Sequence, residues 1–272
     1  MSVTDKPLAG KRIVMTRAPE QAPTFFRALT DAGASVILFP CIEFAAPDDY
    51  GPLDSAISHL DEFDWLTFTS QNAVRFFTRR HRARGTAHSA PTSRRPKVAA
   101  LGNATAEVAT KLEWPPDFVA SNARSGAEFV SALASLARGQ RILLPQSDQA
   151  DERIPTALRE VGAFVTCVVA YRACMPKSLD SNALARIRRD ETDMIFFASP
   201  SAFRNFAQAV GEETMEQLAK DSAFGAIGPT TAGAIRAAGV RVGIESPQPS
   251  ASAIVKSMHE FFIARGSAKV GQ

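Results

Sequence analysis

Short apolar bursts alternate with amphipathic stretches along the chain. The bursts IVM, WLTF, ILL and MIFF have the length and composition of buried strands. Between such bursts lie stretches with the apolar spacing of a helix face, such as PEQAPTFFRALTDAG at 19–33 and SASAIVKSMHEFFIARG at 250–266. This alternation predicts parallel sheets with helices packed on them, which is the α/β fold class.

The two halves of the chain repeat one another. GKRIVMTR, ALTDAGASVI and DWLTFTS in the first half match GQRILLPQ, ALREVGAFVT and DMIFFAS, in each case 129 positions later. Further on, AALGNATAEVATKL matches GAIGPTTAGAIRAA 126 positions later, so the first copy carries three extra residues. The repeat predicts two α/β domains of similar construction, with the extra residues in the basic segment 79–97.

Four strand-to-helix junctions are rich in Ser, Thr, Asn and Gly. They are TSQNA at Ser70, LGNATA at Gly102, ASPSA at Ser199 and IGPTTA at Gly228. Ligands of open α/β sheets bind where strands turn into helices, and the unpaired amides of a helix start attract carboxylate or phosphate. Each junction alone is also compatible with ordinary helix capping. Together, in two copies, they predict a site for a ligand with several carboxylates.

Recognisable catalytic and cofactor motifs are missing from the sequence. It contains no GxxxxGK[ST] loop, no complete GxGxxG after a strand, and no supported Ser/His/Asp or Cys/His arrangement. The three cysteines and four histidines lack metal-ligand spacing, which favours reduced, idle thiols and no metal site. An enzyme of this kind is expected to work by holding a reactive substrate in one shape.

Composition and charge narrow the class of protein. With 272 residues, 45% of them hydrophobic, the chain can bury one large core or two domains of ordinary size. A net charge of +3 suits an anionic small molecule and does not require a nucleic-acid partner. The segment 79–97 is basic and contains no acid, which predicts a solvated loop or, as the alternative, a polyanion-binding segment.

The N-terminal sequence and the length of the apolar runs indicate where in the cell the protein is expected. The N-terminal sequence has no export signal, and the longest apolar run, 163–171, is too short to span a bilayer. We therefore expect a cytoplasmic protein without a membrane partner.

Five motifs in order, TFTSQNAV, VAALGNATA, VVAYRAC, FFASPSAF and AIGPTTAGAI, resemble the uroporphyrinogen-III synthase family. The resemblance extends from GKRIVMTRAPEQ to SPQPSASAIV. It implies two flavodoxin-like three-layer α/β domains joined by a two-strand connector, with the N-terminal segment swapped into the C-terminal domain. The implied boundaries are 1–41 with 174–272 for one domain, 46–168 for the other, and 40–47 and 168–176 for the connectors.

The same resemblance implies a reaction. The family closes the linear tetrapyrrole hydroxymethylbilane to uroporphyrinogen III, without a cofactor and with inversion of the last pyrrole ring through a spiro intermediate. This lyase step belongs to tetrapyrrole biosynthesis, which leads to haem, sirohaem or cobalamin. A monomer is implied, with the polycarboxylate substrate as its partner and a transient contact with hydroxymethylbilane synthase.

Site residues follow from matching the motifs. Tyr171 is the candidate that assists departure of the substrate hydroxyl, and a packing role is the alternative. Ala173 stands where the family often has threonine, which removes one hydroxyl from this segment. Arg17 is a candidate carboxylate partner or an ordinary surface arginine. The candidate substrate-binding residues at the junctions are Ser70, Gln71, Asn72, Asn103, Thr105, Ser199, Ser201, Gly228, Thr230 and Thr231.

Three other functions remain open from the sequence. A non-catalytic two-domain anion-binding or sensor protein would use the same junctions. An FMN-dependent electron carrier would share the fold, but flavin sites need stacking aromatics, and Trp65 and Trp114 are typical of core or helix-end positions. Nucleic-acid binding through 79–97 is the third.

Overall fold

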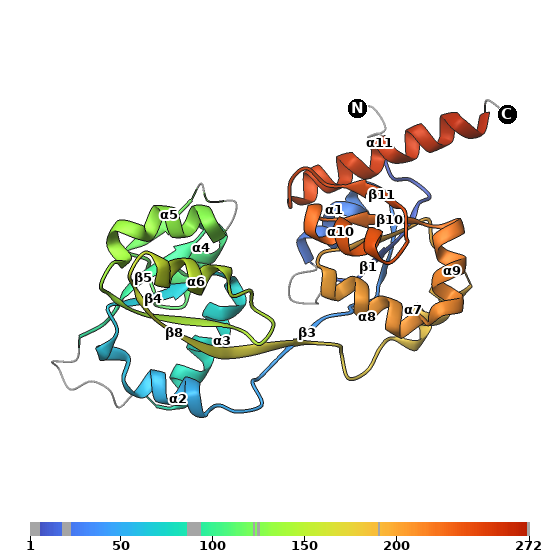
Figure 1. The fold of residues 1–272 in the computed structure, drawn as a ribbon. Coiled ribbons are helices and arrows are strands. Elements are labelled where there is room, and N and C mark those ends of the chain that lie inside the picture. The colour runs from blue at the N-terminus through green and yellow to red at the C-terminus, as the bar shows by residue number, and fades with distance from the viewer. Residues whose placement is uncertain are drawn as a thin grey trace. The chain divides into compact units, whose positions relative to one another are not determined.

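The chain folds into two compact units, which are described separately. The computed structural model describes residues 6–17, 23–85, 94–121, 123, 126–189 and 191–270, with side chains to residue 265. One unit comprises Met1–Glu43 and Cys174–Gln272, and the other comprises Phe44–Ala173 (Figure 1). The chain thus passes from one unit to the other twice, once at each of two extended segments.

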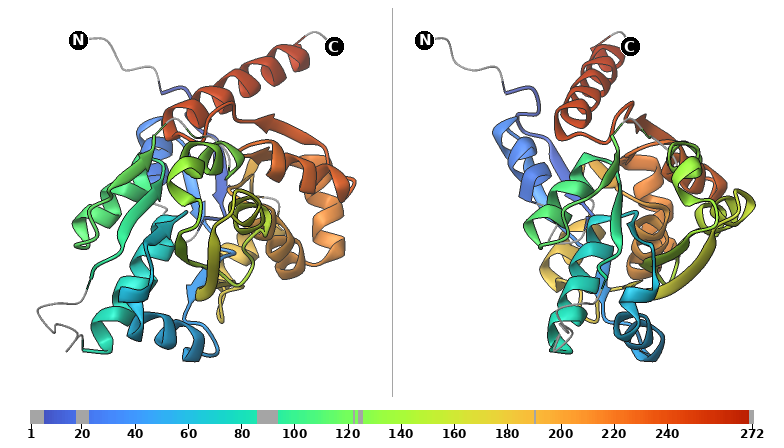
Figure 2. Two further views of the ribbon diagram at one scale, coloured as in Figure 1. Left: turned by 60° about the vertical axis from the view of Figure 1, so that its left-hand side comes forward. Right: turned by 90° about the vertical axis from the view of Figure 1, so that its left-hand side faces the viewer.

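The first unit is built on a five-stranded parallel sheet in the order β11-β10-β9-β1-β2. Ile13 and Phe196 pack against α1 and α11, which lie side by side on one face (Figure 1, Figure 2). Phe197 points to the other face and packs against α8. The elements are β1 (Arg12–Met15), α1 (Pro23–Asp31), β2 (Ser35–Leu38), α7 (Ser181–Arg188), β9 (Met194–Phe197), α8 (Pro200–Val210), α9 (Glu212–Asp221), β10 (Ala223–Ala226), α10 (Pro229–Ala237), β11 (Val242–Glu245) and α11 (Ala251–Val270).

The second unit is built on a six-stranded sheet in the order β3-β8-β7-β4-β5-β6, and the pairs from β8 to β6 are parallel. Leu66 and Phe68 pack against α2 and α3, whereas Trp65 packs against α5 on the opposite face. The elements are β3 (Glu43–Ala45), α2 (Gly51–Ser58), the 3-10 turn η2 (Leu60–Glu62), β4 (Trp65–Phe68), α3 (Gln71–Ala83), β5 (Lys97–Leu101), α4 (Asn103–Lys111), β6 (Phe118–Ala120), α5 (Gly126–Ala137), β7 (Arg141–Ser147), α6 (Arg153–Glu160) and β8 (Phe164–Cys174). Two sheets dominated by parallel pairs, with helices on both faces, confirm the predicted α/β class.

Each sheet combines strands from both copies of the repeat. In the first unit, the carboxylate of Asp193 accepts the backbone N–H of Arg12 at 2.7 Å. In the second, Asp64 accepts the backbone N–H of Arg141 at 2.8 Å. Asp64 and Asp193 are equivalent in the repeat, as are Arg12 and Arg141, so the two units make the same contact with the partners exchanged between copies.

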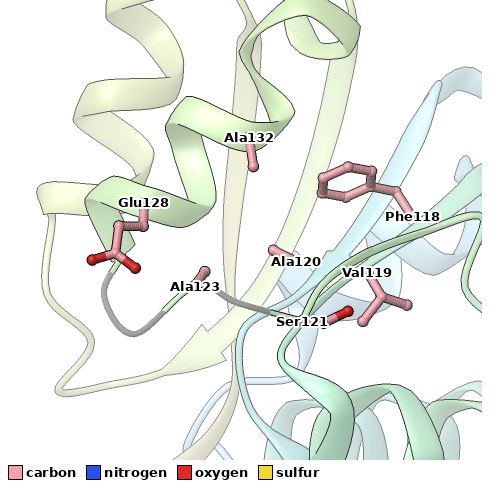
Figure 3. A pocket seen from close by; sticks show the side chains of 7 residues that line it. All are labelled: Phe118, Val119, Ala120, Ser121, Ala123, Glu128 and Ala132. Atoms are coloured by element: carbon pink, nitrogen blue, oxygen red, sulfur yellow. The ribbon is translucent and has the colours of Figure 1, made fainter.

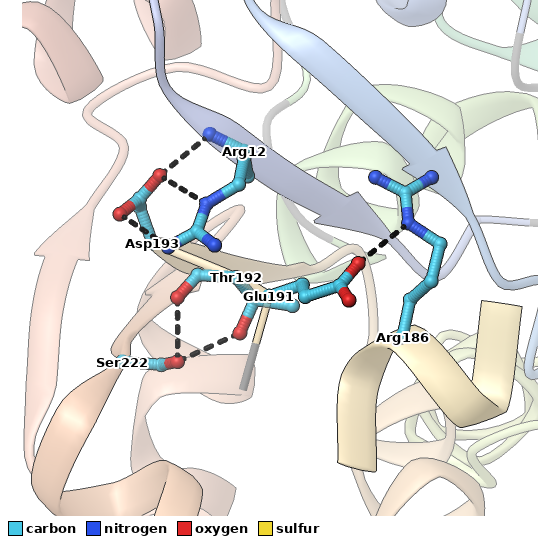
Figure 4. Close-up of polar contacts among 6 residues, drawn as sticks. All are labelled: Arg12, Arg186, Glu191, Thr192, Asp193 and Ser222. Atoms are coloured by element: carbon cyan, nitrogen blue, oxygen red, sulfur yellow. Dashed lines mark hydrogen bonds and ion pairs between the residues drawn. The ribbon is translucent and has the colours of Figure 1, made fainter. Parts of the chain in front are cut away.

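Polar contacts fasten the amino ends of the strands in the first unit (Figure 4). The Arg12 side chain also pairs with Asp193, with Nε 3.2 Å from Oδ2. The buried hydroxyls of Thr192 and Ser222 lie 2.8 Å apart, and the Ser222 hydroxyl donates to the Thr192 carbonyl at 3.1 Å. Burial alone would raise the pKa of Asp193, but the side-chain and backbone hydrogen bonds from Arg12 outweigh it and hold that pKa below its usual range.

Replacing Asp193 by asparagine should make this contribution visible as a pH dependence. A carboxyl whose pKa is lower in the folded chain stabilises the fold above its unfolded pKa of about 3.9, and the effect disappears as the pH falls through the folded value. At pH 7 we expect Asp193→Asn to lower the free energy of unfolding by about 1–2 kcal/mol, since the Arg12 side chain is 41% exposed and partly screened. Urea unfolding of both proteins between pH 7 and pH 3 measures this difference, which should shrink below about pH 4. A difference that is independent of pH would contradict the assignment.

Glu113 is a non-glycine residue with a positive φ, at 70°. It follows α4, where the N–H of Trp114 bonds the Ala109 carbonyl and the N–H of Glu113 bonds the Thr110 carbonyl, a Schellman arrangement. In the second copy the same position holds Gly239, with a φ of 77°. The first copy therefore places a residue with a Cβ where glycine is favoured.

We expect Glu113→Gly to raise the free energy of unfolding by about 0.5–1 kcal/mol, because it relieves the left-handed backbone. Its ion pair with Arg82 offsets little, since the two side chains are 82% and 54% exposed. Chemical denaturation measures the change. The matched substitution, Gly239→Ala, should lower stability by about 1 kcal/mol, and a stability loss in Glu113→Gly would contradict this account.

The prediction of a solvated loop over 79–97 is wrong at both ends of the segment. Helix α3 continues to Ala83, and Lys97 begins β5. The reason is an acid on the neighbouring helix. Asp54 of α2 lies 2.6 Å from Arg80 Nε and 2.9 Å from Arg84 Nη1, so it compensates part of the positive charge of a segment that contains no acid of its own. Residues 86–93 lie outside the described residues.

Candidate functional site

Two of the four predicted helix starts are serine caps with the same geometry. Ser70 precedes α3 in an extended conformation, and its Oγ accepts the N–H of Ala73 at 3.1 Å. Ser199 precedes α8 in the same way and accepts the N–H of Ala202 at 3.1 Å. The Ser199 hydroxyl lies 3.1 Å from that of Ser201. Each strand therefore ends in a hydroxyl because that hydroxyl closes the first turn of the next helix.

The other two starts are glycines. Gly102 precedes α4 with a φ of 78°, a conformation that favours glycine, and Gly228 precedes α10. Neither can offer a side chain to the helix, so the first-turn amides of α4, and those of α10 after Pro229, have no side-chain cap. Exposed helix amides and the positive end of the dipole are the features that bind carboxylates.

The starts occur in adjacent pairs. In the second unit α3 and α4 follow the neighbouring strands β4 and β5, and in the first unit α8 and α10 follow the neighbouring strands β9 and β10. Each unit thus carries one serine-capped and one glycine-capped helix start side by side at the carboxyl edge of its sheet.

Tyr171 lies at this edge in the second unit. It sits near the end of β8, opposite Ser147 of β7, and only 7% of it is exposed. Phe76 of α3 stacks on the ring with centroids 5.4 Å apart, and Phe44 of β3 meets it edge-on at 5.7 Å. The Tyr171 hydroxyl lies 3.2 Å from Ser70 Oγ. The ring is therefore held by packing while its hydroxyl meets the start of α3.

The surroundings of Tyr171 keep the phenol protonated. Burial raises its pKa, the hydrogen bond with Ser70 acts in the opposite direction, and the nearby charge of Asp148 raises the pKa further. The Asp148 carboxylate is itself fixed by the Ser147 hydroxyl at 2.9 Å and by the backbone N–H of Ala173 at 3.0 Å. A protonated phenol at neutral pH is a proton donor.

The remaining candidates divide by burial. Asn72, Thr105 and Thr231 are 3–7% exposed, so their side chains pack in the first turns of their helices and do not form a free surface. Arg17 follows β1 at the carboxyl edge, with its guanidinium 4.3 Å from the centre of the Phe25 ring. Burial lowers the pKa of Arg17. The partly exposed candidates are Ser70, Gln71, Ser199, Ser201 and Gly228, and the exposed ones are Asn103 and Thr230.

A pocket of about 360 Å³ opens at the carboxyl end of β6, beside the start of α5 (Figure 3). Its wall is mostly apolar, with the Phe118 ring near Ala132, and it includes the carboxylate of Glu128. A carboxylate in the wall disfavours an anionic ligand. The lining residues are Phe118, Val119, Ala120, Ser121, Ala123, Glu128 and Ala132.

Sequence reasoning missed the groups that surround Tyr171. Phe44, Phe76 and Asp148 were not among the candidates, although Asp148 follows the strand that the repeat matches to β1. At the carboxyl edge of the sheet in the first unit, the buried Thr16 hydroxyl donates to the Phe196 carbonyl at 2.9 Å and joins β1 to β9. The repeat was the signal that could have indicated the ends of β1 and β7 as site positions.

The cysteines and other metal-binding side chains form no chemical centre in the described part of the chain. All three cysteines are free thiols, and burial raises the pKa of Cys41 to about 12. No group of three or more His, Cys, Asp or Glu among the described residues could hold a metal ion. Within the same residues, no helix is both long enough and apolar enough to cross a membrane.

Comparison with known proteins gives consistent results. The sequence model described as uroporphyrinogen-III synthase HemD matches residues 24–256. A uroporphyrinogen-III synthase of Synechococcus elongatus is 34% identical over 239 residues, covering 84% of this chain and 87% of that protein. A uroporphyrinogen-III synthase of Chlorobaculum parvum is 27% identical over 86% of this chain and 92% of its own length.

Solved structures share the fold. The uroporphyrinogen-III synthetase of Helicobacter pylori superposes with a TM-score of 0.61 at 18% identity, over 90% of this chain and 97% of that one. A mutant synthase of Thermus thermophilus gives a TM-score of 0.60 at 17% identity, over 94% of this chain and all of its own. At these sequence identities, the similarity is evidence for a shared fold alone.

Proposed function

The chain belongs to the uroporphyrinogen-III synthase family, and we propose that it closes hydroxymethylbilane to uroporphyrinogen III with inversion of the last pyrrole ring. The observation that carries the proposal is the family match over 24–256, which includes all four helix starts and Tyr171. The activity is that of a cyclising lyase of porphyrin biosynthesis. No observation favours a non-catalytic anion-binding protein.

The proposed reaction begins with loss of the terminal hydroxyl of the bilane to give an azafulvene. The substituted carbon of the last ring attacks it and forms a spiro intermediate, which fragments and recloses. In water the bilane closes without inversion, so the protein must favour one geometry over another that is intrinsically reactive. Holding the reacting ends together and excluding other conformations is the contribution that a rigid α/β scaffold can make.

We propose that the helix starts bind substrate carboxylates. Each pyrrole ring carries an acetate and a propionate, so the substrate presents several negative charges. The uncapped amides at the starts of α4 and α10, which in α10 begin after Pro229, are the first choice, since those of Ala73 and Ala202 are already taken by serine oxygens. Each carboxylate at a helix start gains about 0.3–1 kcal/mol from the dipole, more where water is excluded.

Tyr171 is the proposed proton donor to the departing hydroxyl. Its support is geometric: the phenol is held between Phe44 and Phe76, it stands at the carboxyl edge of the sheet, and it is protonated at neutral pH. Asp148 is a positioning group, since its carboxylate fastens the backbone just after Tyr171.

An assay of isomer composition tests the function. The purified protein is given freshly made hydroxymethylbilane, the product is oxidised to uroporphyrin, and the isomers are separated by chromatography. We expect isomer III with protein and isomer I in a protein-free control. Isomer I alone, from protein shown by circular dichroism to be folded, would refute the catalytic assignment and favour an anion-binding role.

We further propose that the protein acts in the cytoplasm as a monomer and receives its substrate through transient contact with hydroxymethylbilane synthase. Fractionation of cells and light scattering of the purified protein test the first two statements. The transient contact with hydroxymethylbilane synthase is supported by the chemistry of the substrate, because a bilane that cyclises spontaneously in water must be transferred rapidly.

A further inference from the structure

We propose that Ser70 is a positioning residue for Tyr171, donating its hydroxyl hydrogen to the phenol oxygen so that the phenol proton faces the substrate and the phenolate formed on proton transfer is stabilised. The inference deepens the proposed function and rests on Tyr171 as the proton donor. It goes beyond the substrate-binding role expected for Ser70 from its place in the TSQNA motif.

Ser70 is able to donate to Tyr171, because its hydroxyl hydrogen is not used in the cap of α3. Its Oγ takes the N–H of Ala73 at 3.1 Å, so the hydroxyl still has its own hydrogen to place. The Tyr171 oxygen lies 3.2 Å away. If Tyr171 donated instead, its proton would be held by the second lone pair of Ser70 Oγ at the start of α3 and would not be available for transfer. With Ser70 as the donor, the phenol proton is free to leave.

The start of α3 adds to the effect. Ser70 is the N-cap, and the Tyr171 oxygen that contacts it lies close to the positive end of the α3 dipole. Negative charge that develops on the phenol is stabilised there, while the neutral phenol gains little. The serine and the helix therefore act mainly on the charged state, which is the requirement for stabilising the proton-transfer step.

The repeat shows that this contact is special to one copy. Ser199 caps α8 with the same 3.1 Å bond as Ser70, but its neighbouring hydroxyl is Ser201. The position equivalent to Tyr171 in the first copy holds Ile42. A capping serine is thus present in both units, and a phenol that it can polarise is present in one.

Charged groups on the elements packed round the phenol are few. Beyond β7 lies Asp148, whose charge raises the pKa of Tyr171. On α3, Arg79 lies over the Phe76 ring, 4.9 Å from its centre. On β8, Arg172 pairs with Asp48 at 2.8 Å, and Glu43 begins β3. Ser70 is uncharged, and its hydrogen bond lowers the pKa of Tyr171, whereas the charge of Asp148 raises it.

The proton balance of the step is closed. The C–O bond of the terminal hydroxymethyl group breaks and its electron pair leaves with the hydroxyl, which takes the proton of Tyr171 and departs as water. The substrate is left as a protonated azafulvene cation, and Tyr171 becomes a phenolate that keeps the hydrogen bond from Ser70. When the last ring recloses, its carbon loses one proton, and that proton restores the phenol. Ser70 keeps its own proton throughout, so no further reactant is required.

Two variants of Ser70 test the proposal. Ser70→Gly removes the hydroxyl and preserves most of the helix cap, since glycine is tolerated at that position. Ser70→Thr keeps a hydroxyl. The chain has two tyrosines, so ring-labelled tyrosine NMR resolves Tyr171 with Tyr50 as an internal reference. The full-length protein is titrated without substrate, and kcat for isomer III formation is measured as a function of pH.

In Ser70→Gly we expect the Tyr171 titration to move to higher pH, the Tyr50 titration to stay in place, and kcat to fall about 10- to 100-fold. Ser70→Thr should restore both. Ser250→Ala, which removes a comparable cap from α11, where Ser250 Oγ accepts the N–H of Ala253 at 3.3 Å, should keep the titration and kcat of the parent.

The outcomes separate this proposal from the proposed function. An unchanged Tyr171 titration in Ser70→Gly, with activity retained, overturns the role of Ser70 while the synthase activity stands. A parent protein that makes no isomer III overturns the proposed function and with it the catalytic role of Ser70, even if the two hydroxyls prove to be coupled in the titration.

Discussion

Replacing Tyr171 by phenylalanine is expected to lower kcat for isomer III formation by about 100-fold, the usual contribution of a positioned proton donor. The ring contacts with Phe44 and Phe76 are retained, so the fold and KM should change little. Initial rates measured by isomer-resolved chromatography give both constants. Because the bilane also closes spontaneously, the variant should yield a larger share of isomer I at long times.

The other tyrosine provides the control. Tyr50 lies in the same unit beneath the guanidinium of Arg80, which is 3.8 Å from the ring centre, and it has no place in the proposed site. Tyr50→Phe removes one phenol hydroxyl just as Tyr171→Phe does, and it should leave kcat within twofold of the parent. If Tyr171→Phe also stays within twofold, the tyrosine is a packing residue, and the reaction proceeds by conformational selection without this donor.

Truncating Phe197 to alanine is expected to lower the free energy of unfolding of the first unit by about 3–5 kcal/mol, as for other large buried side chains. Phe197 is fully buried in β9, with the rings of Phe203, Phe206 and Phe224 at centroid distances of 5.3, 5.4 and 5.9 Å. The rings left around the cavity are carried by α8 and β10, so the cavity cannot collapse without moving both elements. Hydrogen exchange read by mass spectrometry locates the loss, which should fall in Met1–Glu43 and Cys174–Gln272.

Two further phenylalanines calibrate this experiment. Phe68 is the repeat equivalent of Phe197, it is also fully buried, and Phe68→Ala should destabilise the second unit instead. Phe164 is 68% exposed, so Phe164→Ala should change stability by less than about 0.5 kcal/mol. Equal loss of protection in both units on Phe197→Ala would show that the units unfold together and would contradict the prediction of separate cores.

Much of the candidate site was predictable because it is local. A serine followed by a helical stretch specifies its own cap, so Ser70 and Ser199 close their helices through atoms three residues away. The glycine starts are local in the same sense, since Gly102 adopts a backbone conformation that other residues avoid. The end of α3 was predicted wrongly because the acid that supports it, Asp54, lies on another helix.

The burial of individual side chains could not be predicted from the sequence. Thr105 and Thr231 match each other in the repeat and stand at helix starts, which suggested polar groups facing a ligand. In the structure both are in the first turns of helices whose apolar faces pack on the sheet, and they are 5% and 3% exposed. Which side of a helix faces the sheet depends on how the whole element packs, and a threonine fits either side.

By itself, the sequence determined the alternation of strands and helices, the duplication, and the four helix starts, because these depend on periodicity and on contacts within a few residues. The tertiary structure decided the exchange of partners between copies, in which Arg12 meets Asp193 across 181 positions. It also decided that the Tyr171 hydroxyl meets Ser70 across 101 positions, between Phe44 and Phe76. The physical reason is that strand order and helix packing place these groups together, and neither is encoded in the spacing of residues along the chain.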